Sequence, residues 1–178
     1  ISKLGGVDFD QKLVELVGKK YKEATGEELT PEDYSITEAE EDKIILSKKT
    51  KTIARQDEIN SAIIEITRSE FEEAISNLVM QTEIMLQATI EEAGINVSEI
   101  NEIIMVGGST RIPSISESIK NVFKRDPVSC DKVDEAVSLG AALYSSHKGD
   151  QSNLNEAQKS SMDSLNIVEC ANHCFGTI

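Results

Sequence analysis

The sequence predicts an α/β protein, with a mixed sheet, flanking helices and a small inserted α+β subdomain. Three observations lead to this class. Helical periodicity covers most of the chain, two short β-like runs lie close together at 50–55 and 62–66, and an all-apolar run at 103–106 leads directly into glycines and another helical pattern. An early hairpin followed by alternating strands and helices indicates an α/β assembly that a smaller unit interrupts.

The first two predicted elements are helices. The first follows the turn signal Leu4-Gly5-Gly6 and ends at Gly26. Its apolar positions recur on one face and are Phe9, Leu13, Leu16, Val17 and Tyr21. The second helix is predicted over residues 36–47, and its acidic first half suits the positive end of a helix dipole. Its predicted apolar side consists of Ile36, Ile44 and Ile45.

The two β-like runs, separated by residues 57–60, predict a hairpin. The longest helix then opens at residues 67–69 and ends at Gly94. Ser69 and Glu72 have the spacing of a capping box. The predicted buried side of this helix consists of Phe71, Ile75, Leu78, Val79, Met85, Leu86 and Ile90.

The second half of the chain continues the alternation. Residues 103–106 are predicted as a strand buried on both faces. Ile112-Pro113 opens a helix that runs to about Lys124, and a last helix covers residues 134–144. Its small residues, which allow close packing, are Gly140, Ala141 and Ala142. The chain then turns polar until residue 164, as a linker would, and becomes apolar again at 165–178.

Composition and charge exclude several classes of partner. Hydrophobic residues make up 39% of the 178 residues and aromatic residues only 4%, so we expect an aliphatic core. The net charge of -14 repels phosphate backbones and anionic lipid, which argues against nucleic-acid and membrane partners. Three cysteines cannot all pair, so we expect a cytoplasmic, reducing setting. A start without Met reads as an excerpt from a longer protein.

Residues 103–113 form the sharpest chemical feature. Gly107 and Gly108 have no Cβ, so a ligand could approach the backbone closely, and a helix N-terminus that follows offers free N–H groups to a phosphate. Arg111 could stack on a base or pair with phosphate. A tight strand-to-helix turn without a ligand is the competing interpretation, because short glycine motifs are common.

A second group lies on the helix predicted over 36–47. Spacings of three and four residues place Glu40, Lys43 and Ser47 on one helical face. A carboxylate, an ammonium and a hydroxyl could together hold sugar hydroxyls and the edge of a base. Taken by themselves, these residues favour the simpler interpretation of a solvated charged face with one ion pair.

Four ordered stretches together resemble the seventy-kilodalton heat-shock (DnaK-type) chaperone family. They are Leu4–Asp10, Ile66–Glu72, Gly107–Pro113, and Asp134–Val137 with Gly140–Ala142. Gly107–Pro113 resembles the adenosine motif of the family, and the similarity runs from about residue 4 to 146. The resemblance implies the C-terminal lobe, lobe II, of an actin-like ATPase fold that binds ATP or ADP.

Carried over position by position, the resemblance implies roles for individual residues. Glu40, Lys43 and Ser47 match residues that bind ribose and adenine. Gly107, Gly108, Ser109 and Arg111 match residues that line the adenine and nearby phosphates, with Arg111 against the base. Ile112 flanks the base, and Asp134 matches a residue at the cleft near the adenosine.

Departures from the family pattern limit what the chain is expected to do. Val133 stands where the family usually has Pro, and residues 27–37 match poorly. The phosphate loops, catalytic lysine and glutamate, and metal-site aspartates of the family precede the part that resembles this chain. We therefore expect no catalytic residue, no metal ligand and no independent ATP hydrolysis here, with Mg²⁺ held by other parts of the parent protein.

The resemblance also divides the chain and implies partners. Residues 1–79 resemble subdomain IIB, 80–148 part of subdomain IIA, 149–169 the interdomain linker, and 170–178 the start of the peptide-binding domain or a frayed tail. A nucleotide exchange factor and a J-domain co-chaperone are the implied partners of the parent protein. Unfolded polypeptide clients would bind through a separate domain. A sheet without its first strands has open edges, which would permit a strand-swapped dimer.

Other interpretations stay open at this point. The chain could be an interaction module that binds an exchange factor of the GrpE type without nucleotide, or a lobe of another protein of the actin and sugar-kinase superfamily. Cys170, His173 and Cys174 lack a fourth ligand and regular spacing for a metal site. Cys130 with His147 lacks a third orienting group, so a plain buried thiol is favoured.

Overall fold

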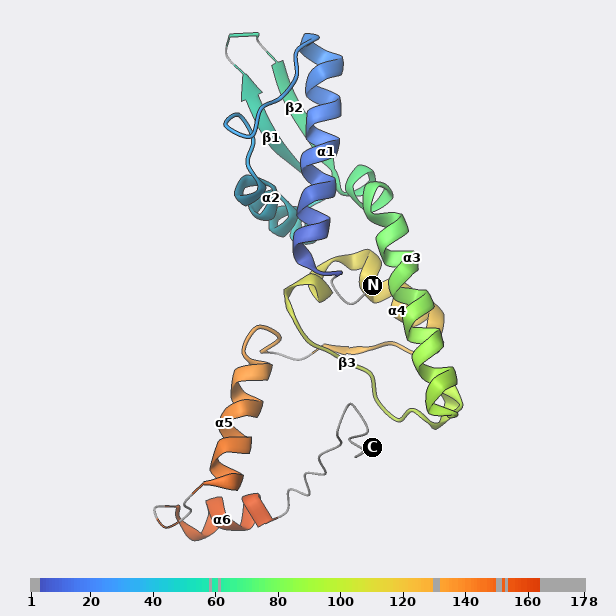
Figure 1. Cartoon of the computed structure of the whole chain (residues 1–178), viewed down its shortest axis with the longest axis vertical. Helices are drawn as coiled ribbons and strands as arrows, with labels where there is room; N and C mark the ends of the chain where they lie inside the picture. Colours follow the sequence, from blue (N-terminus) through green and yellow to red (C-terminus); the bar gives the residue numbers. More distant parts are fainter. Residues whose placement is uncertain are drawn as a thin grey trace, which may run out of the picture. The chain divides into compact units, whose positions relative to one another are not determined.

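A computed structural model describes residues 4–57, 59–60, 62–129, 132–149, 152 and 154–163. The chain divides into two compact units, residues 1–133 and 134–178, and each is described by itself. The first unit contains most of the elements in Figure 1. Its hydrophobic core brings together side chains of α1, α2, β2, α3 and α4, whose bounds are given below.

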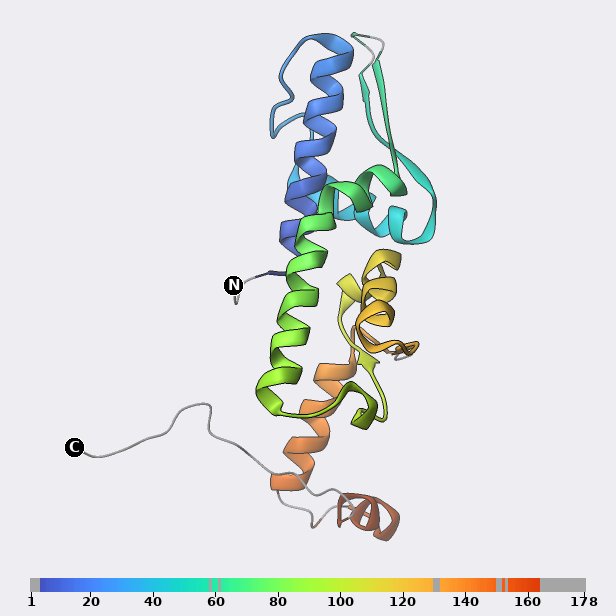
Figure 2. The ribbon, with the colours of Figure 1, turned by 90° about the vertical axis from the view of Figure 1, so that its right-hand side faces the viewer.

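Helix α1 (Gly6–Thr25) forms where the sequence predicts it. Phe9, Leu13, Val17 and Tyr21 recur every fourth residue and are all buried. The backbone N–H of Gly5 donates to Asp8 Oδ2 at 2.7 Å, which gives a partner to one backbone N–H group at the N-terminus of the helix. Gly26 ends the helix with a φ of 80°, a left-handed conformation that suits glycine. Figures 1 and 2 show α1 running alongside the hairpin.

Helix α2 (Ile36–Lys48) has the predicted bounds within a residue but buries a different face. Ile36 and Ile44 are 42% and 46% exposed, so the predicted apolar side is wrong. The buried residues are Ala39, Asp42, Lys43 and Leu46. Polar groups can occupy this face because they have partners: Asp42 accepts hydrogen bonds from Tyr34 Oη at 2.9 Å and Thr52 Oγ1 at 2.6 Å. Burial raises the pKa of the Tyr34 hydroxyl.

The predicted hairpin is confirmed. Strand β1 (Lys51–Asp57) pairs antiparallel with β2 (Ala62–Thr67), and a bulge lies between Ile53 and Arg55. Burial alternates along β2, as period-two side chains require, so Ile64 and Ile66 enter the core while Ile63 is exposed.

A hydrogen-bonded carboxylate fixes the turn of the hairpin to α1. Asp57 Oδ2 accepts from Tyr21 Oη at 2.6 Å, and Asp57 Oδ1 accepts from the backbone N–H groups of Ile59 and Asn60 at 2.9 and 3.1 Å. The hydrogen bond from Tyr21 is the largest of the influences that lower the pKa of Asp57 to about 2. The same bond raises the pKa of Tyr21.

The depressed pKa of Asp57 predicts a dependence of stability on pH. Because the folded value of about 2 lies below the ordinary 3.8, the Asp57 contribution is present above pH 3.8 and is lost as the pH falls towards 2. Asp57→Asn should flatten the acid-side decline in the free energy of unfolding within this window. Urea unfolding at a series of pH values measures the slope, and an unchanged slope in the variant would contradict the expectation.

Helix α3 (Arg68–Ala93) ends at Gly94 as predicted, but its cap and part of its buried face differ. The capping box uses Thr67 and Glu70, two residues earlier than the predicted Ser69 and Glu72. Thr67 Oγ1 accepts from Glu70 N at 3.2 Å, and Glu70 Oε2 accepts from Thr67 N at 2.8 Å. Phe71, Ile75 and Val79 are buried as predicted.

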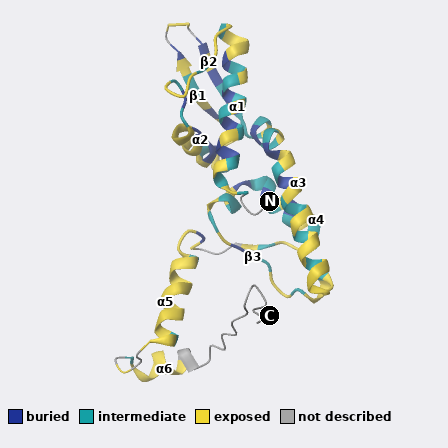
Figure 3. Cartoon of the chain, viewed as in Figure 1, coloured by how far each residue is buried: buried dark blue, intermediate teal, exposed yellow. Residues whose placement is uncertain are grey.

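The second half of α3 is not buried as the periodicity predicted. Met85 is 41% exposed, and Leu86 and Ile90 are only partly buried. Figure 3 shows the change from buried to exposed residues along the helix. The core of the first half comes mainly from α1 and β2, whereas α4 contacts both halves, at Glu72 and at Glu83. Periodicity alone does not show how far a helix extends beyond its core.

The strand after α3 is short and largely exposed. β3 (Ile104–Met105) pairs in parallel with β4 (Val128–Ser129). Met105 is buried, but Ile104 and Val106 are 61% and 41% exposed, so the prediction of a strand buried on both faces is wrong. Among the described residues, β1–β2 and β3–β4 are separate two-stranded sheets rather than one mixed sheet.

Helix α4 (Pro113–Phe123) begins with proline at its first position, where no intrahelical N–H bond is lost. Two hydrogen bonds join it to α3. Ser114 N donates to Glu72 Oε1 at 3.2 Å, and Ser118 Oγ donates to Glu83 Oε1 at 2.6 Å. The segment before α4, which carries the glycine motif, is therefore attached to the core through α4.

The second unit contains α5 (Ala136–Lys148) and α6 (Glu156–Asp163), which contact each other. Gly140, Ala141 and Ala142 are exposed on α5, where close packing was predicted. Helix α6 lies within the segment predicted as a linker, and the predicted boundary between residues 79 and 80 falls inside α3. The predicted apolar segment 165–178 lies outside the described residues. No helix in the described ranges is long and apolar enough to cross a membrane.

Candidate functional site

Three segments of the first unit meet at Gly6. Lys43 Nζ on α2 lies 2.6 Å from Asp10 Oδ1 of α1 and donates to the carbonyl oxygen of Gly6 at 3.3 Å. A Cβ placed on Gly6 would lie 3.3 Å from Ser109 Oγ and 3.4 Å from Lys43 Nζ. The glycine therefore allows a close approach of α1, α2 and the glycine-rich segment. Lys43 and Ser109, 66 residues apart in the printed sequence, border the same point.

The ion pair between Lys43 and Asp10 is buried. The side chains are only 11% and 5% exposed. An ammonium has three N–H donors, and Gly6 O accepts from one of them, whereas Asp10 Oδ1 pairs with the charge at 2.6 Å without a hydrogen bond of its own. Lys43 therefore keeps N–H donors for another group. Asp10 escaped the sequence analysis as a site residue, although a signal was present: a carboxylate stands between Phe9 and Leu13 on a face that buries apolar side chains.

Glu40 and Ser47 flank Lys43 on α2. Glu40 is exposed and makes no hydrogen bond or ion pair with any residue in the described ranges. Its two carboxylate oxygens are therefore open to a ligand. Ser47 is half-buried and donates to the carbonyl oxygen of Ile44 at 2.8 Å, which leaves its own oxygen able to accept.

The glycine-rich segment is a tight turn rather than an extended loop. Gly107 has a φ of 99°, and its N–H donates to Val133 O at 3.2 Å. Nothing lies within 4 Å of a Cβ built there, so the backbone conformation and not crowding requires glycine. Thr110 closes the turn, because its Oγ1 donates to Gly107 O at 2.6 Å. A short 3₁₀ helix, η2 (Gly108–Arg111), follows.

The remaining predicted site residues occupy different surroundings. Ile112 is 3% exposed and belongs to the hydrophobic core, so it anchors the segment that precedes α4. Arg111 is exposed. Asp134 lies in the second unit, where it is exposed in the turn before α5. Cys130, Cys170, His173 and Cys174 lie outside the described residues.

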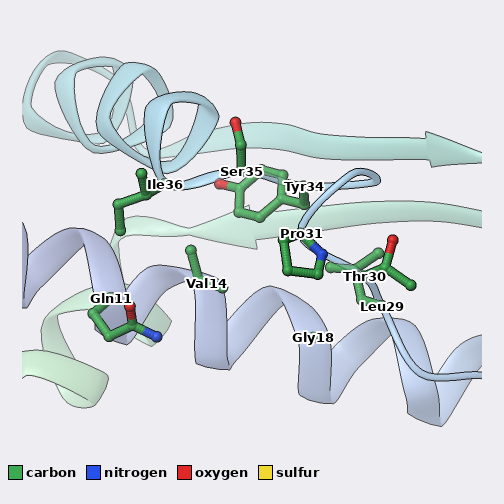
Figure 4. A pocket seen from close by; sticks show the side chains of 9 residues that line it. All are labelled: Gln11, Val14, Gly18, Leu29, Thr30, Pro31, Tyr34, Ser35 and Ile36. Carbon is green, nitrogen blue, oxygen red and sulfur yellow. The ribbon is translucent and has the colours of Figure 1, made fainter.

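A separate pocket lies beside α1 and includes none of the predicted site residues. Figure 4 shows Gln11, Val14 and Gly18 on one side and the segment 29–36 on the other, around a volume of about 370 Å³. Tyr34, whose hydroxyl is bonded to Asp42, forms part of its wall.

The groups around Gly6 suit a polar, hydroxyl-rich ligand. Lys43 offers an N–H donor and Ser109 offers a hydroxyl next to backbone that carries no side chain at Gly107 and Gly108, and Glu40, three residues before Lys43 on α2, offers acceptors. A metal ion has no comparable site in the described part of the chain, where no group of three His, Cys, Asp or Glu side chains could hold one.

Residues 2–156 match the family described as Hsp70 protein. The match covers most of the 178 residues and includes α1, α2 and the glycine-rich segment, the three segments that meet at Gly6. The chain therefore belongs to the Hsp70 chaperone family.

Proposed function

We propose that this chain supplies the adenosine-binding half, of the lobe II type, of the nucleotide-binding domain of an ATP-dependent protein-folding chaperone. Hsp70 proteins as a family bind ATP and act with co-chaperones on client polypeptides. The single observation that carries the proposal is the meeting of Lys43 and Ser109 at Gly6. It brings the α2 group and the glycine-rich turn, which are far apart in sequence, to one place.

In the proposed complex, the α2 residues bind the sugar and base of ATP or ADP. Lys43 donates a remaining N–H to a ribose hydroxyl, and Glu40 accepts from another. Gly107, Gly108 and Ser109 lie under the nucleotide, and Arg111 stacks on the base. Backbone without side chains permits a ligand to lie flat against the turn.

Hydrolysis is not part of this proposal. Phosphoryl transfer depends on groups and metal ions that are positioned around the γ-phosphate. The residues that meet at Gly6 include one lysine, and that lysine is already paired with Asp10. In the proposed division of labour, other parts of the parent protein carry the Mg²⁺ and the catalytic groups.

Glu40→Ala is the sharpest test of the proposal. Glu40 is exposed and has no partner in the described ranges, so its removal should leave the fold intact. A hydrogen bond to a charged group contributes about 1.5–3 kcal/mol, so the affinity for ADP should fall about tenfold or more. Calorimetric titration of the 178-residue chain with ADP measures the change.

Glu41→Ala is the matched control. The two glutamates are adjacent, exposed and equal in charge, but Glu41 lies outside the predicted site. Equal ADP affinities for the two variants would contradict the proposed role of Glu40. Absence of saturable ADP binding to the unmodified chain at millimolar concentration would contradict the proposed function itself.

A second candidate function is an interaction module for a nucleotide exchange factor. The outward face of the hairpin favours it, because Ile53 and Ile63 are 58% and 62% exposed and Ile59 at the turn is 94% exposed. Exposed apolar side chains that lie together are typical of binding surfaces. Binding of an exchange factor by a chain that does not bind ADP would favour this candidate over the first.

A further inference from the structure

Asp10 lies next to the proposed ligand position but reaches it only through Lys43. We propose that Asp10 is a positioning residue, which holds Lys43 in a buried neutral pair so that Lys43 binds as a hydrogen-bond donor rather than as a free cation. This inference rests on the proposed adenosine-binding function. It adds Asp10 to the residues of that site and explains why the site would select a sugar hydroxyl over a phosphate ion.

The geometry fixes the ammonium from two directions. Asp10 Oδ1 lies 2.6 Å away, and the Gly6 carbonyl oxygen lies 3.3 Å away, both in the first turns of α1. The hydrogen bond to Gly6 and the charge of Asp10 hold the tetrahedral ammonium in place, so its remaining N–H donors have defined directions. The long lysine side chain has therefore lost its rotamer freedom before a ligand arrives, which reduces the entropic cost of binding.

Burial makes the pairing obligatory. Asp10 is 4% exposed and Lys43 is 9% exposed, so neither charge can be solvated well. Each charge is therefore compensated by the other and not by water. Without Asp10, the ammonium would need a different counter-ion.

The neutral pair has a consequence for ligand selection. A free lysine is a point charge that attracts phosphate. A lysine already neutralised by a carboxylate gains little from an anion, but its remaining N–H still donates to a neutral hydroxyl. Asp10 thus favours the sugar of a nucleoside at this position and disfavours a bare phosphate ion.

The test compares adenosine, which has no phosphate, with inorganic phosphate. In Asp10→Asn, the carboxylate is lost while the size of the side chain is kept. Adenosine affinity should fall about tenfold or more, since Lys43 is no longer held. Phosphate, which should not bind the unmodified chain measurably, should gain detectable affinity. If Asp10→Asn merely loosened the site, the affinity for adenosine would fall and the affinity for phosphate would not rise.

Glu23→Gln is the matched control, because it removes one negative charge from an exposed position on the same helix. Circular dichroism melts show whether each variant is folded. If Asp10→Asn does not fold, Lys43→Gln is compared with the double variant Asp10→Asn/Lys43→Gln. Equal adenosine affinities support the inference, because Asp10 acts through Lys43, and a further loss in the double variant overturns it.

The outcomes separate this inference from the function on which it rests. If the unmodified chain binds neither adenosine nor ADP, the proposed function fails and the inference fails with it. If the unmodified chain binds adenosine, and Asp10→Asn behaves like Glu23→Gln or gains no phosphate affinity, the inference alone is overturned.

Discussion

Phe71→Ala is expected to lower the free energy of unfolding by about 3–5 kcal/mol, the range for removal of a buried aromatic ring. Phe71 is 1% exposed at the start of α3, and it belongs to the core that joins α1, β2 and α3. Alanine removes the ring and leaves a cavity that these elements cannot close without moving. Urea unfolding followed by circular dichroism measures the change.

Met80→Ala is the control for this prediction. Met80 lies on the same helix but is 58% exposed, so its truncation should change the free energy of unfolding by less than about 0.5 kcal/mol. A small loss in Phe71→Ala, similar to that of Met80→Ala, would mean that the core does not depend on the start of α3.

Lys43→Met is expected to have a comparable effect for a different reason. The variant keeps an unbranched side chain of similar length but leaves the buried Asp10 carboxylate without its ion-pair partner. Breaking a buried pair on one side costs about 3–5 kcal/mol. The same urea experiment measures this loss, and the variant should also unfold at a lower temperature.

The double variant Asp10→Leu/Lys43→Met identifies the cause. When both charges are replaced by apolar side chains of similar volume, the result is often neutral or stabilising. The double variant should therefore regain most of the stability that Lys43→Met loses. A double variant as unstable as the single one would show that packing, and not the unpaired charge, explains the loss.

The sequence predicts those elements whose structure depends on local patterns. Four apolar residues at spacings of four define α1, and Gly26 and Gly94 end their helices because each adopts a positive φ. The hairpin follows from two β-like runs separated by a short turn. In each case, the residues that determine the element lie within a few positions of one another.

The sequence does not predict features that depend on distant partners. The buried face of α2 contains Asp42 because Tyr34 and Thr52 donate to it, and periodicity identifies neither donor. The length of buried surface along α3 depends on where α1 and β2 end. Ile104 remains exposed in a two-stranded sheet, although an all-apolar run is typical of a strand covered on both faces.

The candidate site also combines features that the local sequence predicts with features that depend on distant partners. Family resemblance assigned Glu40, Lys43 and Ser109, and the printed sequence places the first two on one helical face. Only the three-dimensional arrangement brings Lys43 and Ser109 to Gly6 and pairs Lys43 with Asp10. The roles of all these residues in binding adenosine stay predictions until the titrations are made.

The unbroken course of α3 has a mechanical consequence. Its 26 residues extend over about 39 Å at the usual rise of an α-helix. One end is packed against α1 and β2, and hydrogen bonds reach α4 both from Glu72 near that end and from Glu83 farther along the helix. A tilt of the hairpin end would therefore be transmitted along a stiff lever arm to α4. The α2 side and the glycine-rich turn of the candidate site could then shift together, while α2 and the turn both stay folded.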